Sequence, residues 1–133
     1  GYVGVGDFLG SRFTESRRNM LPVVNAINQR GLLYLDSGSS PRGIASALAQ
    51  DLEMTFATAT LTLDKWASRK NIDRKFAELE KRAKSGKQAI GIASPYPVTL
   101  EKISDWAVQL RARGVVLAPI SALSQKNMPV ENR

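Results

Sequence analysis

The stretch GLLYLD at residues 31–36 decides the fold. Its glycine suits the end of a helix, its four apolar residues suit a buried strand, and Asp36 puts a carboxylate where that strand would end. Short β-rich runs of this kind alternate with longer amphipathic segments along the whole chain. This alternation is typical of βα units around a mostly parallel sheet, so the sequence predicts an α/β fold.

The pattern predicts five strands and four helices. The strands are expected at residues 2–5, 32–36, 58–63, 88–93 and 115–119. Three helices are expected at residues 14–30, 71–85 and 99–113, each ending at a glycine: Gly31, Gly86 and Gly114. The remaining helix is predicted to begin with Ser40 as its N-cap and Pro41 at its first position. Residues 1–125 are predicted to form a single α/β domain, and residues 126–133 a frayed tail.

The composition restricts the chemistry open to the chain. With 133 residues, 43% of them hydrophobic, it can bury the core of one domain. It has no cysteine and no histidine, which excludes disulfides, thiolate metal sites and an imidazole base. No apolar run approaches the roughly 20 residues of a membrane-spanning helix. The net charge of +7 favours anionic partners, although its cations also fit solvated helix surfaces.

Candidate functional residues lie at the predicted strand ends, where parallel α/β folds gather their sites. Asp36 and Asp64 each close a β-rich run, where a carboxylate can bind metal, act as a base or cap the next loop or helix. The neighbouring loops add Asp7, Arg12, Ser37, Ser94 and Tyr96. The Tyr96 ring, fixed between two prolines, could stack on a sugar or simply pack against its loop.

A glycine-rich stretch offers a rival interpretation. Residues 4–10, GVGDFLG, follow the first predicted strand and are similar to a dinucleotide-binding loop. However, the spacing is G-x-G-x-x-x-G, and the next helix is expected only from Thr14. Such a long loop would not bring the helix N-terminus to a pyrophosphate, so nucleotide binding is the weaker interpretation.

Seven stretches keep a common order and spacing over nearly the whole chain: GV at 4–5, GSRFT at 10–14, GLLYLDS at 31–37, SP at 40–41, IGI at 90–92, PYP at 95–97 and GVVLAPIS at 114–121. Together they resemble the divergent polysaccharide deacetylases of bacteria. The resemblance implies part of a deformed (β/α) barrel, a periplasmic or envelope location, and hydrolysis of N-acetyl groups on carbohydrate with a divalent metal such as zinc.

The chain departs from the family where the metal ligands are expected. The family commonly has a histidine before Met-Gly-Ser, and this chain has Phe8 before Leu-Gly-Ser. The family also commonly has His-Pro-His-Pro, and this chain has Ser94-Pro-Tyr96-Pro. These side chains are poor zinc ligands or none, so the resemblance leaves the metal ligands unassigned.

Three functions are compatible with these residues. The leading hypothesis is a deacetylase-like domain that has lost its imidazole metal site and binds glycan, with Asp36 and Asp64 as the catalytic positions and Asp7, Arg12, Ser37, Ser94 and Tyr96 facing the sugar. The second is an active deacetylase with an all-oxygen metal site, to which a preceding strand adds aspartates. The third is an anion-binding or nucleic-acid-binding module, which ranks below carbohydrate binding.

The sheet edge is expected to have a partner. The chain opens in a predicted strand, and a parallel barrel without its first strands would expose an edge. The N-terminal part of the same domain, or a second copy of the chain, is expected to cover it.

Overall fold

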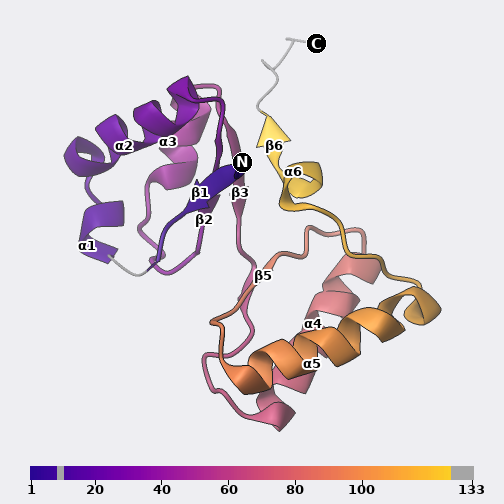
Figure 1. Ribbon diagram of the computed structural model, residues 1–133. Coiled ribbons are helices and arrows are strands. Elements are labelled where there is room, and N and C mark those ends of the chain that lie inside the picture. The colour runs from indigo at the N-terminus through magenta and orange to yellow at the C-terminus, as the bar shows by residue number, and fades with distance from the viewer. Residues whose placement is uncertain (9–10, 127–133) are drawn as a thin grey trace. The chain divides into compact units, whose positions relative to one another are not determined.

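The computed structural model describes residues 1–8 and 11–126, and these residues form two compact units (Figure 1). Unit 1 comprises Gly1–Thr58 and the chain from Ile120 onward, and unit 2 comprises Ala59–Pro119. The single domain expected over residues 1–125 stays a prediction. Residues 127–133 of the predicted tail lie outside the described residues.

Unit 1 is built on a four-stranded sheet in the order β1-β2-β3-β6. Its strands are β1 (Gly4–Gly6), β2 (Leu33–Asp36), β3 (Thr55–Thr58) and β6 (Gln125–Lys126), and its helices are α1 (Ser11–Thr14), α2 (Arg17–Gln29), α3 (Ala45–Asp51) and α6 (Ile120–Leu123). The first three strands are parallel, and β6 runs antiparallel to β3. The carboxyl ends of β1 and β2 therefore lie next to each other.

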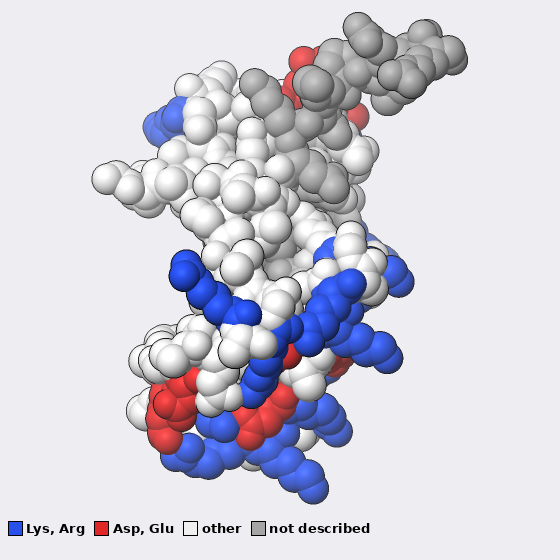
Figure 2. Space-filling view, turned by 90° about the vertical axis from the view of Figure 1, so that its right-hand side faces the viewer, with Lys and Arg blue, Asp and Glu red and all other residues white. Residues whose placement is uncertain are grey.

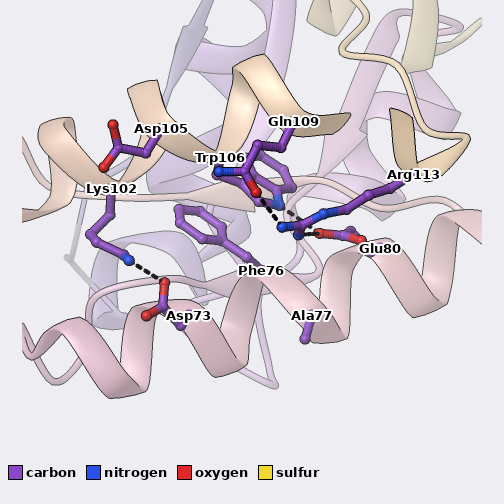
Figure 3. A pocket seen from close by; sticks show the side chains of 9 residues that line it. All are labelled: Asp73, Phe76, Ala77, Glu80, Lys102, Asp105, Trp106, Gln109 and Arg113. Carbon is purple, nitrogen blue, oxygen red and sulfur yellow. Dashed lines mark hydrogen bonds and ion pairs between the residues drawn. The ribbon is translucent and has the colours of Figure 1, made fainter. Parts of the chain in front are cut away.

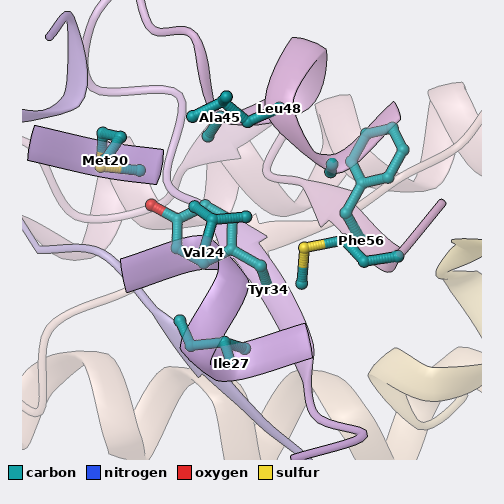
Figure 4. Close-up of a cluster of buried hydrophobic side chains, with 9 residues drawn as sticks. Met20, Val24, Ile27, Tyr34, Ala45, Leu48 and Phe56 are labelled. Atoms are coloured by element: carbon teal, nitrogen blue, oxygen red, sulfur yellow. The ribbon is translucent and has the colours of Figure 1, made fainter. Parts of the chain in front are cut away.

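The core of unit 1 lies between the sheet and the helices α2 and α3 (Figure 4). Val24 of α2 and Leu48 of α3 are fully buried, and they belong to one cluster with Tyr34 of β2 and Phe56 of β3. The apolar residues of α2 recur at helical spacing, which gives this helix one buried face. The packing holds the helices against the face of the sheet to which Tyr34 contributes.

Unit 2 pairs two short strands with two long helices. The strands β4 (Leu61–Thr62) and β5 (Gly91–Ile92) are parallel, and the helices are α4 (Arg69–Lys84) and α5 (Pro97–Leu110), the latter followed by a 3₁₀ turn, η1 (Arg111–Arg113). Leu63, Ile72, Phe76 and Leu79 form the buried cluster. Trp106 of α5 stacks on Phe76 of α4 with ring centroids 4.3 Å apart. This contact fastens the two helices to each other.

The described residues confirm a mixed α/β fold with parallel strands. The predicted glycine stops are also confirmed, because Gly31, Gly86 and Gly114 follow their helices with φ of 66°, 71° and 75°. Other residues rarely adopt this left-handed conformation. No described helix has the length and apolarity that a transmembrane span requires.

The single strand predicted at residues 58–63 is wrong. The run contains two strands of different sheets: β3 ends at Thr58, and β4 begins at Leu61. Thr60 and Leu61 already donate their backbone N–H groups to the Ile90 carbonyl oxygen beside β5. No glycine or proline marks the change of sheet, so the composition of the run hides the break.

The strand predicted at residues 115–119 is also absent from the described residues. The segment has β-forming side chains but follows η1 without pairing to a strand, and Val116 and Leu117 are 69% and 61% exposed. A β-rich sequence forms a strand only where another strand is available to pair with it.

Two helix starts differ from the predictions. Ser40 does not cap a helix: its carbonyl oxygen accepts from the N–H of Gly43, and α3 begins only at Ala45. Serine, then proline, then glycine at the fourth position is equally a β-turn sequence, and here the turn forms. The helix predicted from Thr14 is divided, because α1 ends at Thr14 and α2 starts at Arg17.

Gly4 is expected to be essential for pairing β1 with β2. A Cβ atom on Gly4 would lie 2.6 Å from the backbone oxygen of Leu33, whereas one on Gly6 would lie 3.4 Å from that of Leu35. We expect Gly4→Ala to destabilise unit 1 by about 2 kcal/mol, since β1 must move away from β2, and Gly6→Ala, its matched control, to cost less than about 0.5 kcal/mol. Amide hydrogen exchange in β2 measures the loss of stability in both variants. Equal losses would contradict the close approach of Gly4 to the Leu33 backbone.

Candidate functional site

Asp7 joins the loops that follow β1 and β2. Its Oδ1 accepts from the backbone N–H of Ser37 at 2.7 Å, and its Oδ2 accepts from the Ser37 hydroxyl at 2.6 Å. Its own N–H donates to the Leu35 carbonyl oxygen at 3.2 Å. Charge-assisted bonds of this kind are strong, so Asp7 acts as a clamp that positions the Ser37 loop. The structure thus brings together Asp7, Asp36 and Ser37, three of the residues that the sequence placed at strand ends, and their catalytic and sugar-binding roles stay predictions.

Asp36 accepts fewer hydrogen bonds than Asp7, the other carboxylate of this cluster. Its Oδ1 accepts from the Gly38 N–H at 2.8 Å, which makes a tight turn at the end of β2. The pKa of Asp36 is raised, chiefly because burial disfavours the charged carboxylate; the Gly38 N–H opposes this rise, and the negative charge of Asp7 adds to it. A half-buried carboxylate with a raised pKa and an oxygen to spare is suited to binding a hydroxyl or moving a proton.

Asp36→Asn is expected to raise the thermal unfolding midpoint at pH 7 but not at pH 3. The folded-state pKa lies above the unfolded value of about 3.9, so ionisation of Asp36 costs stability as the pH rises through the raised pKa. Asparagine removes that cost and keeps an oxygen for Gly38. Melting curves at both pH values test this, with the exposed Asp51→Asn as control; an equal difference at pH 3 and pH 7 would contradict it.

Tyr34 is a member of this cluster that the sequence did not reveal. It is only 3% exposed, and its hydroxyl lies near the Asp7 carboxylate. Burial raises the pKa of Tyr34, and the nearby carboxylates Asp7 and Asp36 raise it further, so the hydroxyl keeps its proton. One signal was available: Tyr34 stands two residues before Asp36, on the same face of β2.

A hollow of about 260 Å³ in unit 1 opens beside Asp7 and Tyr34. Its remaining lining is mostly apolar and includes Phe8 and Phe13, which are 82% and 44% exposed. Arg12 lies on α1 and is exposed; within the described residues no ion pair links it to Asp7 or Asp36. The hollow is therefore an aromatic and apolar surface bordered by the Asp7 carboxylate.

Asp64 occupies the corresponding place in unit 2. It follows β4, is 5% exposed, and through Oδ2 accepts from the Ser94 N–H at 2.8 Å and the Thr99 hydroxyl at 3.0 Å. Thr99 is fully buried in the first turn of α5. The carboxylate therefore positions the loop between β5 and α5, which is the capping role that the sequence left open beside a catalytic one.

The loop held by Asp64 carries two other predicted residues. Ser94 is half-buried and donates its backbone N–H to Asp64, while Tyr96 is 49% exposed and serves as the N-cap residue of α5. Trp66, in the loop before α4, is 69% exposed. The structure brings Ser94 to Asp64 and leaves two aromatic rings of unit 2 open to solvent.

A second hollow, of about 270 Å³, lies between α4 and α5 (Figure 3). Its polar side chains largely bind one another: Lys102 pairs with Asp73 at 2.6 Å, and Glu80 accepts from Trp106 and Arg113 at 2.8 Å each. Burial alone would raise the pKa of Glu80, but these two donors outweigh it and lower the pKa. The groups fix the helix pair, so we assign them a structural role.

The donor set does not fit the zinc site that the resemblance implies. Among residues 1–8 and 11–126, no three His, Cys, Asp or Glu side chains converge to hold a metal ion. Both oxygens of Asp7 bind Ser37, and Asp64 binds Ser94 and Thr99 through one oxygen. The positions matched to the histidines carry Phe8, Ser94 and Tyr96.

Comparisons with known proteins agree with the sequence stretches described above. A family model described as divergent polysaccharide deacetylase matches residues 1–124. The crystal structure of the uncharacterized protein ATU2773 from Agrobacterium tumefaciens C58 is similar, with 35% identity and a TM-score of 0.89 over 92% of this chain and 50% of that chain. The chain thus spans about half the length of that solved structure. No curated protein matches it. Since the family model covers nearly all of its residues, the chain belongs to the divergent polysaccharide deacetylase family.

Proposed function

We propose that the chain belongs to a deacetylase-like domain that binds glycan at the strand ends and has lost the family's metal-dependent hydrolysis. The observation that carries this proposal is how the three strand-end carboxylates, Asp7, Asp36 and Asp64, use their hydrogen-bonding capacity. Asp7 and Asp64 bind neighbouring loops, and only Asp36 keeps most of its hydrogen-bonding capacity. A clamp, a buried tyrosine and one available carboxylate suit the binding of sugar hydroxyls better than metal chemistry.

The surface beside this cluster also suits a sugar. Phe8 and Phe13 present aromatic rings at the hollow next to Asp7 in unit 1. Separately, Trp66 and Tyr96 present rings in the loops of unit 2, where a second sugar-binding surface is proposed. Amphipathic ring faces stack on the C–H groups of a sugar, while carboxylates and hydroxyls accept and donate to its hydroxyl groups. Within this proposal Asp7 and Ser37 contact glycan in unit 1, where Arg12 approaches it from α1, and Ser94 and Tyr96 contact glycan in unit 2. The proposed location is periplasmic or in the cell envelope.

Acetate release and glycan binding by the intact protein test the proposal together. We expect no metal-dependent release of acetate from N-acetylated oligosaccharides, but measurable oligosaccharide binding that Asp36→Ala weakens about tenfold, the loss of one or two hydrogen bonds to a charged group. Asp51→Ala, which removes an exposed carboxylate of the same unit paired with Arg17, is the control. Metal-dependent acetate release that disappears in Asp36→Ala would overturn the non-catalytic version and favour an all-oxygen metal site.

We also propose that additional polypeptide covers the free edge of β1 and completes a deformed barrel. In the β1–β2 ladder, the Val3 carbonyl oxygen and the Asp7 N–H bond to β2, so by alternation Gly4 and Gly6 direct theirs to the open edge. Tyr2 and Val3 are 73% and 60% exposed beside it. Protein edges of this kind are normally covered.

Amide hydrogen exchange on the intact protein tests whether additional polypeptide covers the free edge of β1. The amides of Gly4 and Gly6 are expected to be protected about as well as that of Asp7, which already bonds to β2. Dependence of the protection on protein concentration would identify a second copy as the cover. Rapid exchange at Gly4 and Gly6 beside a protected Asp7 would show the edge to be open.

A further inference from the structure

The positive charge of the chain is concentrated in unit 2. Residues 59–119 contain twelve of the 19 Lys and Arg residues and six of the 12 Asp and Glu residues, which places a net charge of +6 there out of +7 in total. Figure 2 shows Lys and Arg side chains crowding the part of the surface formed by the helices of unit 2. A charge so unevenly distributed creates a local field that attracts anions.

Four of these cations lie in one line along α4, two on either side of Ala77. Lys70, Arg74, Lys81 and Lys84 are all exposed, and at 3.6 residues per turn they align on the side of the helix opposite its buried residues Ile72, Phe76 and Leu79. At a rise of 1.5 Å per residue the stripe is about 21 Å long. We call these four residues the α4 stripe.

No acidic side chain among the described residues forms an ion pair with the α4 stripe, although the charge of Glu78 interacts with Arg74 and that of Glu80 with Lys84. The other charged residues of the helix are paired beside it: Arg69 with Glu101, Lys75 with Glu78, and Asp73 with Lys102. In the described part of the chain none of the four stripe residues forms an ion pair, and Arg74 alone has a recorded side-chain bond, to the Asn71 amide oxygen. The positive charge along this line is therefore only partly offset by the protein's own acidic groups, Glu78 and Glu80.

We propose that the α4 stripe binds a linear anionic glycan, a polymer carrying carboxylate or phosphate groups. This inference rests on the proposed function and specifies its ligand class. A linear polyanion meets successive cations along a straight helix and releases counterions as it binds. A cationic glycan, such as a fully deacetylated amino-sugar polymer, would be repelled by unit 2.

Other polyanions fit the stripe less well. A helix that lies on a membrane places apolar side chains in the bilayer beside its cations, whereas the apolar residues of α4 are buried and Ala77 alone interrupts the stripe. Single-stranded nucleic acids are bound by aromatic rings interleaved with cations, and no aromatic residue lies on the stripe. The observations therefore favour an anionic glycan over a lipid surface or a single-stranded nucleic acid, and the test below distinguishes it from duplex DNA.

The test uses the intact protein and fluorescently labelled polygalacturonate, a linear polyuronate. We expect binding that weakens steeply between about 50 and 200 mM salt. The double variant Lys70→Glu/Lys81→Glu should lower the affinity at least about tenfold, because it reverses two of the four charges of the stripe, one on either side of Ala77. The control Arg18→Glu/Arg30→Glu makes the same change in net charge on exposed residues of unit 1, and it should alter the affinity less than about twofold.

Each result decides the proposal. Equal losses in the two variants would overturn it, because net charge alone would then explain the binding, and so would the absence of polyuronate binding. Binding of duplex DNA or of anionic vesicles as tight as that of polyuronate would also overturn it, in favour of those partners. Neutral oligosaccharide binding, measured with Asp36→Ala, reports on the strand-end site separately, so failure of the stripe and failure of the proposed function remain distinguishable.

Discussion

Asp64→Ala is expected to lower the free energy of unfolding of unit 2 by about 3 kcal/mol. The carboxylate is 5% exposed and accepts from the Ser94 N–H and the Thr99 hydroxyl through a single oxygen. Alanine leaves both donors without their acceptor, and Thr99 lies where water does not reach it. Tryptophan fluorescence during urea unfolding measures the loss, because both tryptophans, Trp66 and Trp106, belong to unit 2.

Two further variants separate the structural role of Asp64 from a catalytic one. Asp105→Ala removes an exposed carboxylate of the same unit and should change stability by less than about 0.5 kcal/mol. Asp64→Asn keeps an oxygen that can accept from both donors, so most of the stability should return. If Asp64 were instead a base, Asp64→Asn would abolish activity as completely as alanine does. A loss below about 1 kcal/mol in Asp64→Ala would show that the loop does not depend on this carboxylate.

The predictable parts of the fold are those that neighbouring residues determine. Strand β2 lies within one residue of its expected bounds, because a run of apolar residues stands between Gly31 and a polar loop. The ends of the long helices follow from the left-handed glycines Gly31, Gly86 and Gly114. These signals act over a few residues and do not depend on the rest of the chain.

The errors occur where distant partners decide the structure. Residues 58–63 form one β-rich run, and its division between two sheets depends on where Ile90 lies. Residues 115–119 have strand-forming side chains without a strand to pair with among the described residues. Composition reports that a residue can form a strand, and pairing decides whether it does.

In the candidate site, too, the sequence predicted which residues are present at the strand ends but not which of them bind each other. Asp7 and Ser37 are 30 residues apart, and so are Asp64 and Ser94; in each pair an aspartate after one strand accepts from the backbone N–H of a serine after the parallel neighbour. The sequence singled out all four residues because they follow strands. It could not show that they bind each other, since that depends on the register of the two ladders.

Asp7→Ala is expected to destabilise unit 1 by about 3 kcal/mol and to release the loop that carries Asp36 and Ser37. Alanine removes the acceptor for the Ser37 N–H and the Ser37 hydroxyl at once, and with it the carboxylate beside the buried Tyr34 hydroxyl. Because unit 1 has no tryptophan, amide hydrogen exchange is the suitable measurement. The Ser37 amide should lose its protection first, and the amides of β2 should report the loss for the whole unit.

The matched control for Asp7→Ala is Asp51→Ala, because Asp51 is an exposed aspartate of unit 1 whose pair with Arg17 lies in solvent. Its removal should cost less than about 1 kcal/mol. If the clamp is real, Asp7→Ala should also cost less in a Ser37→Ala background than in the native chain, since one of its bonds is then already gone. Additive costs would mean that the contact between Asp7 and the Ser37 hydroxyl contributes nothing, and the clamp would then rest on the bond from the Ser37 backbone N–H.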